Sequence, residues 1–324
     1  TAGDTAARAG RKNLIINGGF DVWQRGTSFT ADNVFTTDRW KSADGSGGSP
    51  ARTASRQAFT LGQTDVPDAH YYFRHDQTGA STSGNSSFTT KIEDVTRTAG
   101  KTLTLSFYAK ANASMTIGPR FIQGFGSGGS PSSSVEITET TVTIGTSWTK
   151  HTLTVTMPSI SGKTIGSDGV HTSSTILNID FNPTGTFTFE IAQVQLELGS
   201  VATDFEHRSY GEELALCQRY YQRTYNYGTA TGTATTDGAL LHSMDGTQSY
   251  AKVLWQYKTT MRGTPSITVY NTNNGTAGEV AADAANHAAG LVAVGQSSAS
   301  IGVGGISIGT STYLKAHATA DAEL

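Results

Sequence analysis

The chain has 324 residues and a mass of 34.0 kDa, which is long enough to bury a substantial core in one large domain or two of ordinary size. A net charge of −3 and a pI near 6.2 give it no general attraction to phosphate backbones or anionic lipid. No apolar run approaches the roughly 20 residues that span a bilayer. The composition therefore argues against nucleic-acid partners and membrane insertion.

Glycine is abundant, with 37 residues, and only 15% of the chain is charged. Together with frequent Thr and Ser, this composition is typical of short strands separated by turns. The single cysteine, Cys217, cannot form an internal disulfide, so stability must come from packing, hydrogen bonding or association. We therefore predict an all-β protein without internal disulfides.

The N-terminal region changes character after its first dozen residues. Residues 1–12 are Ala-rich and end in basic residues, which predicts a short helix or an arm that orders against a partner. Residues 13–20, NLIINGGF, predict a short apolar strand ending in a Gly-Gly turn.

From residue 51 the chain alternates apolar and polar residues in the manner of strands, in eight segments: HYYFRHDQTG, FTTKIEDV, KTLTLSFYAKA, MTIGPRFIQGFG, SVEITETTVTI, WTKHTLTVTMP, STILNIDFNP and FTFEIAQVQLELG. In the third of these segments the apolar face holds Leu103, Leu105, Phe107 and Ala109. The opposite face, expected to be wet, holds Thr104, Ser106 and Tyr108. We predict two packed antiparallel sheets over residues 13–208.

The hexapeptide GSGGSP occurs twice, at residues 45–50 and 126–131. Such segments form exposed flexible connectors, and two of them on one rim of a sandwich could instead shape a binding surface.

Residues 209–227 combine helical and strand spacing. Two glutamates stand where the start of a helix favours negative charge, and Leu214, Cys217 and Tyr221 follow at three- and four-residue spacing. Alternating tyrosines then indicate a strand. A nucleophilic cysteine would need a base and an exposed electropositive setting, whereas the position of Cys217 on the apolar stripe favours a small buried hydrophobe.

Residues 228–324 return to the strand-and-turn pattern and predict a second, smaller β domain. Within it, residues 279–293 are rich in alanine but lack a stable apolar stripe, and Gly290 would break a helix. We expect a long hairpin or loop there.

The sequence contains neither a phosphate-binding loop nor a cysteine pair for zinc. His70 and His75 lie an odd number apart, so on one strand they would face opposite ways. We therefore expect no enzymatic activity and no metal. A pair of carboxylates brought together from distant strands would still allow a glycosidase or lyase. Its candidates are Asp38, Asp76, Glu93, Asp94, Glu136, Glu139, Asp180 and Glu190.

Aromatic rings that stack on sugars are the other chemical signal, because flat rings match the apolar faces of pyranoses. Core packing is the alternative role for each ring. The candidate ligand-binding residues are Trp23, Trp40, Tyr72, Tyr108 and Trp148. The tyrosines on polar strand faces, Tyr72 and Tyr108, are favoured among them.

Two segments carry a resemblance to a known family. NLIINGGFDVWQRGTSF followed by TTDRW, and FTFEIAQVQLELGSVATDFEHRSYGEELALCQRYYQRTY, resemble the carbohydrate-binding-module-like domain of tail-fibre and related receptor-binding proteins of tailed bacteriophages. YKTTMRGTPSITVYN and the ending ATADAEL look like the terminal region of the same proteins. The resemblance spans about residues 13–324.

The resemblance implies a jelly-roll β-sandwich at 13–208, a helix-to-strand joint at 209–227 and a distal β domain at 228–324. It further implies a homotrimeric fibre on the exterior of the virion that recognises host surface glycan, so that several shallow sites add avidity. The arm at 1–12 would then attach to other virion proteins. Packing between domains or subunits would involve Leu214, Leu216, Cys217, Tyr220 and Tyr221.

Jelly-roll carbohydrate modules often hold a structural calcium, for which Asp21 and Glu197 are the candidate ligands here. Ala192 and Gln193 stand where acidic residues of the last strand would be expected. Because calcium requires several oxygen ligands including carboxylates, we expect no cofactor.

Two other functions remain open on the sequence alone. The chain could be a structural, decoration or connector protein of the virion that binds no glycan. It could also be a polysaccharide depolymerase with carboxylates lining a groove.

Overall fold

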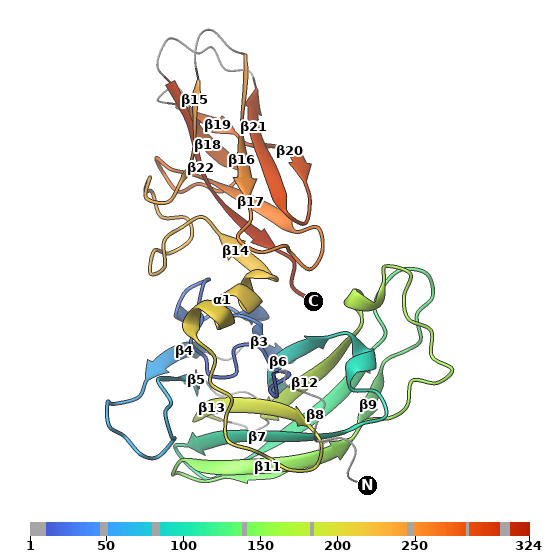
Figure 1. Cartoon of the computed structure of the whole chain (residues 1–324). Helices are drawn as coiled ribbons and strands as arrows, with labels where there is room; N and C mark the ends of the chain where they lie inside the picture. The colour runs from blue at the N-terminus through green and yellow to red at the C-terminus, as the bar shows by residue number, and fades with distance from the viewer. Residues whose placement is uncertain are drawn as a thin grey trace. The chain divides into compact units, whose positions relative to one another are not determined.

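A computed structural model describes residues 11–45, 51–79, 85–137, 141–181, 185–244, 249–282, 285–304 and 312–324 (Figure 1). The chain divides into two compact units. Unit 1 consists mainly of the residues up to Trp23 and of Thr27–Glu213, and unit 2 consists of Gln24–Gly26 and Leu214–Glu323. The predicted arm at 1–12 lies, except for its last two residues, outside the described part of the chain.

Unit 1 is a jelly-roll β-sandwich, as predicted. Its first sheet, sheet A, is antiparallel with the order β1-β4-β5-β13-β7-β11. Its strands are β1 (Ser28–Phe29), β4 (Arg52–Ala58), β5 (Tyr71–Gln77), β13 (Phe187–Leu198), β7 (Thr102–Ala111) and β11 (Thr149–Thr156).

The second sheet of unit 1, sheet B, has the order β10-β8-β12-β6-β3-β2, with β9 paired to β8. Its strands are β10 (Val142–Ile144), β8 (Met115–Gly124), β12 (Ser174–Phe181), β6 (Asn85–Glu93), β3 (Trp40–Gly45), β2 (Val34–Phe35) and β9 (Val135–Ile137). Two short 3-10 turns, η1 (Val95–Arg97) and η2 (Val170–Thr172), lie between strands.

The core of unit 1 forms where the inward residues of the two sheets meet. In β7 the predicted apolar face is fully buried, from Leu103 to Ala109. Aromatic rings dominate the contact: Phe73 of β5 stacks on Phe88 of β6 with ring centroids 3.8 Å apart, and Phe88 stacks on Trp40 of β3 at 4.5 Å. Period-two alternation thus positions large rings of both sheets in one core.

The outer face of sheet A is covered over one half of the length of its strands, which corrects the expectation of a wet face on β7. Thr104 donates from Oγ1 to the carbonyl of Gly199 at 2.8 Å, and Gln195 donates from Nε2 to the carbonyl of Asp204 at 3.1 Å. Thr104 and Ser106 are therefore buried. The chain that follows β13 lies over this half and leaves the other half open.

Residues 13–20 do not form the predicted strand. Asn17 adopts φ +58°, and its amide nitrogen donates to the carbonyl of Val22 at 2.8 Å while its Oδ1 accepts from the Val22 amide at 3.0 Å. A side chain that binds the backbone in this way competes with ladder formation. Gly18 lies so close to β13 that a Cβ would stand 2.0 Å from the Val194 carbonyl oxygen, so no larger residue fits there.

Unit 2 contains two further sheets. The first has the order β14-β22-β18-β19, with β15 and β17 also paired to β22, and the second has the order β16-β21-β20. The strands are β14 (Tyr221–Arg223), β15 (Leu240–Met244), β16 (Tyr250–Gln256), β17 (Ser266–Asn271), β18 (Glu279–Ala282), β19 (Ala285–Ala288), β20 (Gly290–Val294), β21 (Ser298–Gly304) and β22 (Thr312–Asp321). Within the predicted hairpin or loop at 279–293, β18 and β19 pair antiparallel as in a hairpin, and β20 begins at Gly290.

Helix α1 (Tyr210–Gln218) runs into β14, as the change of spacing predicts. Ser209 caps the helix, because its Oγ accepts from the Glu212 amide at 3.3 Å. Cys217 is only 1% exposed, which fits a small buried hydrophobe. The division of the chain between the two units falls inside α1. In the described part of the chain, no helix is long and apolar enough to cross a membrane.

Candidate functional site

The open half of the sheet A outer face carries charged side chains at its centre. Register places Arg74 of β5 opposite Glu190 of β13, and Glu190 opposite Lys110 of β7. Directly opposed residues of antiparallel strands share a face, so the three side chains stand together. We call Arg74, Lys110 and Glu190 the ion group.

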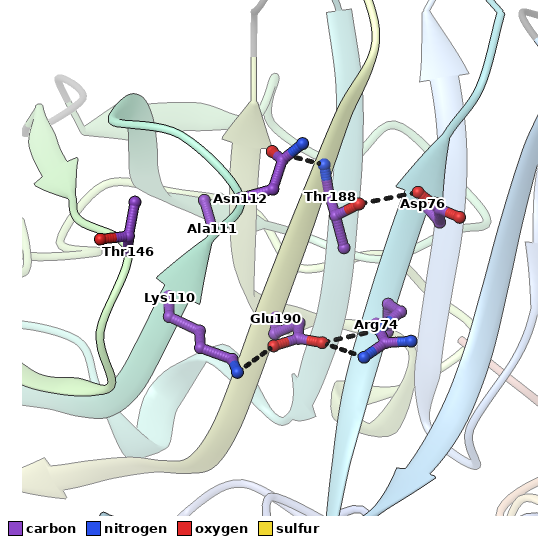
Figure 2. Close-up of a pocket in the computed structure, with 8 residues that line it drawn as sticks. All are labelled: Arg74, Asp76, Lys110, Ala111, Asn112, Thr146, Thr188 and Glu190. Atoms are coloured by element: carbon purple, nitrogen blue, oxygen red, sulfur yellow. Dashed lines mark hydrogen bonds and ion pairs between the residues drawn. The ribbon is translucent and has the colours of Figure 1, made fainter.

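Both cations of the ion group bind one carboxylate. Arg74 donates from Nε to Oε1 of Glu190 at 2.6 Å, and Lys110 Nζ lies 3.0 Å from Oε2 (Figure 2). The Glu190 side chain is only 5% exposed, whereas those of Arg74 and Lys110 are 35% and 32% exposed. The carboxylate therefore lies beneath two cations that reach solvent.

A pocket of about 410 Å³ opens over the ion group. At its other end the Thr188 hydroxyl donates to Oδ1 of Asp76 at 2.8 Å, and the Thr188 amide donates to Oδ1 of Asn112 at 3.0 Å (Figure 2). The lining residues are Arg74, Asp76, Lys110, Ala111, Asn112, Thr146, Thr188 and Glu190. The pocket thus holds hydrogen-bond donors and acceptors in fixed positions, and its lining includes both cationic and anionic side chains.

Three aromatic rings pack together on the same open half. Tyr72 of β5 lies 4.7 Å from Phe59 and 5.3 Å from Trp148, and Phe59 and Trp148 are 5.3 Å apart, all between ring centroids. All three residues are partly exposed. Lys110 Nζ lies 5.2 Å from the centre of the Trp148 ring, which links these rings to the ion group. We call Phe59, Tyr72 and Trp148 the surface ring cluster.

The surface ring cluster spans strands that are not neighbours. Trp148 immediately precedes β11, and two strands, β13 and β7, separate β11 from the β5 strand that carries Tyr72. Three strand spacings correspond to about 14 Å. Rings from the two sides nevertheless meet at 5.3 Å. Their side chains must therefore reach towards each other across the sheet, so the surface ring cluster covers the intervening strands beside the pocket.

A small residue stands between the flanking strands at this point. Ala192 of β13 is paired with Tyr108 of β7 and is fully buried although it belongs to the outward series with Glu190. Immediately beyond it the ladder shifts register, and Gln193 adopts φ +49°. The alanine leaves room for the tyrosine rings on either side.

Burial and the Glu190 carboxylate shift the pKa values of two groups at the site, Arg74 and Tyr72. Burial opposes the charge of Arg74, but the hydrogen bond and the charge of Glu190 outweigh it and raise the pKa of the guanidinium. Burial, followed by the negative charge of Glu190, raises the pKa of the Tyr72 hydroxyl. Arg74 is therefore charged and Tyr72 neutral near pH 7.

Two of the five predicted ligand-binding residues, Tyr72 and Trp148, are brought together by the fold. Tyr108 lies on the same outward face and is half-buried. The structure corrects the prediction for Trp23 and Trp40, because these residues are only 7% and 0% exposed and pack in the core. Trp23 also donates from Nε1 to the carbonyl of Phe20 at 2.7 Å, so both its ring and its polar atom are engaged.

Sequence reasoning did not select Phe59, Arg74 and Lys110 as candidate site residues. The alternation of Tyr72, Arg74 and Asp76 along β5 was a usable signal, because it places three side chains of the candidate site on one outward face. Phe59 follows β4, and nothing in its local sequence marks it as a partner of Tyr72.

The two candidate calcium ligands have other surroundings. Glu197 is buried and accepts from the Thr203 amide at 3.0 Å and from the Thr203 hydroxyl at 2.6 Å. Burial raises the pKa of Asp21, against the opposing charges of His70 and other neighbours. Within the described ranges no three His, Cys, Asp or Glu side chains gather in a way that could hold a metal ion.

The residues predicted to pack between domains or subunits lie on α1, in the turn after it and at the start of β14. Cys217, Tyr220 and Tyr221 are buried, whereas Leu214 and Leu216 are half-buried. Their role in a joint stays a prediction.

Two other surfaces carry polar or apolar groups. On the outer face of sheet B, Arg120 donates from Nε to Asp180 at 2.9 Å and from Nη1 to Glu136 at 2.8 Å, and burial raises the pKa of Asp180. Unit 2 has a groove of about 530 Å³ whose walls include the exposed side chains of Tyr250 and Leu254. On the sheet A face, by contrast, the described residues combine a pocket, an ion group and a ring cluster.

No protein-family model matches the chain, and no curated protein sequence matches it. Several solved structures are similar in fold at low identity. A CBM4 module is 21% identical, covers 56% of this chain and 98% of its own, and has a TM-score of 0.33. The CBM22-1 xylan-binding domain of Paenibacillus barcinonensis Xyn10C is 13% identical, with 61% and 100% coverage and a TM-score of 0.35.

The enzymatically active domain of tailspike protein 4 from bacteriophage CBA120 is 17% identical to the chain. The match covers 58% of this chain but only 21% of the tailspike, with a TM-score of 0.35. Similarity at this level does not assign a ligand or a site, so the functional case depends on the geometry of the sheet A face.

Proposed function

We propose that the chain binds a glycan on the open half of sheet A. The observation that carries the proposal is the surface ring cluster beside the polar pocket, with Trp148 and Lys110 in contact at 5.2 Å. Sugar rings have apolar faces and a rim of hydroxyls, so recognition requires flat rings next to closely spaced donors and acceptors. The surface ring cluster supplies the flat rings, and the pocket supplies the closely spaced donors and acceptors.

We propose further that the protein is a fibre protein on the exterior of a phage virion, where glycan binding serves recognition of the host and adsorption. This part is supported by the resemblance of residues 13–40 and 187–225 to receptor-binding proteins of tailed phages. The shallow site, open to solvent, suits a protein that relies on several weak contacts rather than one tight one.

The homotrimer belongs to the same proposal. Unit 2 exposes several large apolar side chains, among them Leu254 at 61% and Val292 at 50%, which association of copies could cover. Light scattering on the purified protein should give three times the chain mass of 34.0 kDa. A monomer mass would contradict the trimer and leave the glycan site untouched.

Binding to cells tests the glycan proposal. Labelled protein is incubated with host bacteria before and after periodate oxidation of their surface glycans. We expect binding that oxidation abolishes and that Trp148→Ala strongly weakens. Tyr313→Ala is the matched control, because Tyr313 is an exposed aromatic residue of unit 2, outside the sheet A face.

The same experiment separates the alternatives. Absence of binding in both conditions would contradict the proposal and favour a structural or connector protein of the virion. Release of reducing ends from the isolated polysaccharide would identify a depolymerase and require a catalytic pair of carboxylates.

A further inference from the structure

The ion group exposes more positive than negative charge. Glu190 is the shared partner of Arg74 and Lys110, and its side chain is 5% exposed. Each cation is about one third exposed. One carboxylate compensates only one of two cations, and it does so from below. The surface of the ion group is therefore cationic.

Both cations retain unused hydrogen-bond donors. Arg74 directs Nε and Nη2 to Glu190, and Nη2 also to the Tyr72 hydroxyl at 3.3 Å. Its Nη1 makes no hydrogen bond within the described part of the chain, and Figure 2 shows one guanidinium nitrogen directed away from Glu190. The Lys110 ammonium has three N–H groups and contacts one carboxylate oxygen.

The spacing of the two cations matches a carboxylate. Oε1 of Glu190 is bound by Arg74 and Oε2 by Lys110, so a group of this size already bridges the pair from within the sheet (Figure 2). Both cations line the pocket and retain unused donors, so a second carboxylate could bridge the same pair from outside. Charge-assisted hydrogen bonds of this type are among the strong ones.

The pocket also contains an acidic residue that limits where an anion can bind. Asp76 lies two residues from Arg74 on β5 and accepts from the Thr188 hydroxyl at 2.8 Å. An anion on that side would meet repulsion. On the other side Lys110 stands 5.2 Å from the Trp148 ring. The favoured place for an anion is therefore between Arg74 and Lys110, towards the surface ring cluster.

We propose that the glycan bound on sheet A is acidic, and that a sugar carboxylate bridges Arg74 and Lys110 while the same or the adjacent sugar ring stacks on Trp148. This inference rests on the proposed glycan-binding function and adds the chemical class of the ligand. A uronic acid combines the two features, because its carboxylate is attached to the pyranose ring. Stacking and ion pairing then act on one residue of the polymer.

Calorimetric titration with one polysaccharide in two chemical forms tests the proposal. The probe is the surface polysaccharide of cells to which the protein binds, before and after carbodiimide–borohydride reduction, which converts carboxylates to primary alcohols. We expect the full chain to bind the native form at least about 10-fold more tightly than the reduced form, a difference of about 1.4 kcal/mol. Raising the salt concentration should weaken binding of the native form.

Two variants locate the preference. Lys110→Met should reduce the ratio of the two affinities towards one. Lys150→Met is the matched control: Lys150 is an exposed lysine of β11 whose Nζ donates to the Thr203 carbonyl at 3.2 Å, so the net charge changes equally outside the pocket. It should keep the preference.

Each of the other outcomes refutes a different part of the proposal. Equal affinity for both forms that does not change with salt would refute the acidic ligand and leave glycan binding intact. Binding that survives reduction but still weakens with salt would assign the anion to a sulfate or phosphate substituent and refute the carboxylate. Binding of neither form would refute glycan binding itself.

Discussion

Two of the aromatic clusters in unit 1 differ mainly in their surroundings. The core stack of Trp40, Phe73 and Phe88 has centroid spacings of 3.8 and 4.5 Å and is closed to solvent. The surface ring cluster has spacings of 4.7 to 5.3 Å and remains partly exposed beside charged side chains. The comparison shows that the neighbours of an aromatic ring, and not its type, decide whether it is closed in the core or left at the surface, where we propose that it binds a ligand.

The two clusters lie on opposite faces of the same strand. In β5, Phe73 points inward and its neighbour Tyr72 points outward. A single strand therefore serves both the fold and the site. If the comparison is correct, substitutions on the inward face should affect unfolding, and those on the outward face should affect binding.

Phe88→Ala should have the largest effect. It removes the central ring of the core stack, which contacts both Phe73 and Trp40, and should lower the free energy of unfolding by about 3 to 5 kcal/mol. Chemical denaturation followed by circular dichroism measures the change. Phe88→Leu, which retains more apolar volume, should lose less. A loss below about 1 kcal/mol for Phe88→Ala would contradict the role in stability that the comparison gives to the core stack.

Acid should destabilise the core of unit 1 through His75. Burial, and then the charge of Arg52, lowers the pKa of the His75 imidazole from 6.5 to about 3. The ring is packed between Phe181 and Phe187 at 4.8 and 5.3 Å. Because the unfolded chain binds a proton more readily, this contribution is complete above pH 6.5 and is lost as the pH falls towards 3.

Between pH 7 and pH 4 the loss amounts to about 3 kcal/mol, at about 1.4 kcal/mol for each unit of pKa. Thermal or chemical unfolding over this pH range measures it. His75→Leu should flatten the profile in part, because burial also lowers the pKa of His151 and His317. An unchanged profile in the variant would show that His75 does not contribute.

Trp148→Ala should separate recognition from stability. We expect a loss of at least 2 kcal/mol in glycan binding, about 30-fold in affinity, because a stacking ring at the centre of a site dominates binding. The free energy of unfolding should change by only about 1 kcal/mol, the contribution of its ring contacts. Titration and denaturation of the same sample test both values. An equal loss in the Tyr313→Ala control would show that the effect is not local.

Tyr72→Phe should have the smallest effect. It keeps the ring but removes the hydroxyl that accepts from Arg74 at 3.3 Å, so affinity should fall by about 1 kcal/mol at most. Titration against the same polysaccharide measures the difference. A loss as large as that of Trp148→Ala would mean that the hydroxyl contacts the ligand directly.

The strands β5 to β13 of unit 1 were predictable because their segments carry their own alternation, whereas strands β1 to β4 were not predicted. Leu103, Leu105 and Phe107 identify β7 without any knowledge of its neighbours. The failures are segments whose side chains bind the backbone. Asn17 turns residues 13–20 away from a strand through hydrogen bonds to Val22, and no periodicity reports such bonds.

The site was predictable only in its parts. Tyr72 and Trp148 stand out as aromatic residues in polar surroundings, but Trp40 has equally polar neighbours in the sequence and is buried. The ion group depends on the sheet order β5-β13-β7, which brings Arg74 to Glu190 across 116 positions of sequence. Strand order is a property of the whole fold, so local spacing does not contain it.

Tryptophan fluorescence tests the central claim most directly, because the chain offers one reporter at the proposed site. Of the four tryptophans, Trp23, Trp40 and Trp255 are buried and Trp148 is partly exposed. Acrylamide should therefore quench mainly Trp148. Adding the surface polysaccharide of cells that bind the protein should protect it, and Trp148→Ala should abolish both the quenching and the protection. Binding of the polysaccharide without any protection of Trp148 would contradict a glycan site on the open half of sheet A.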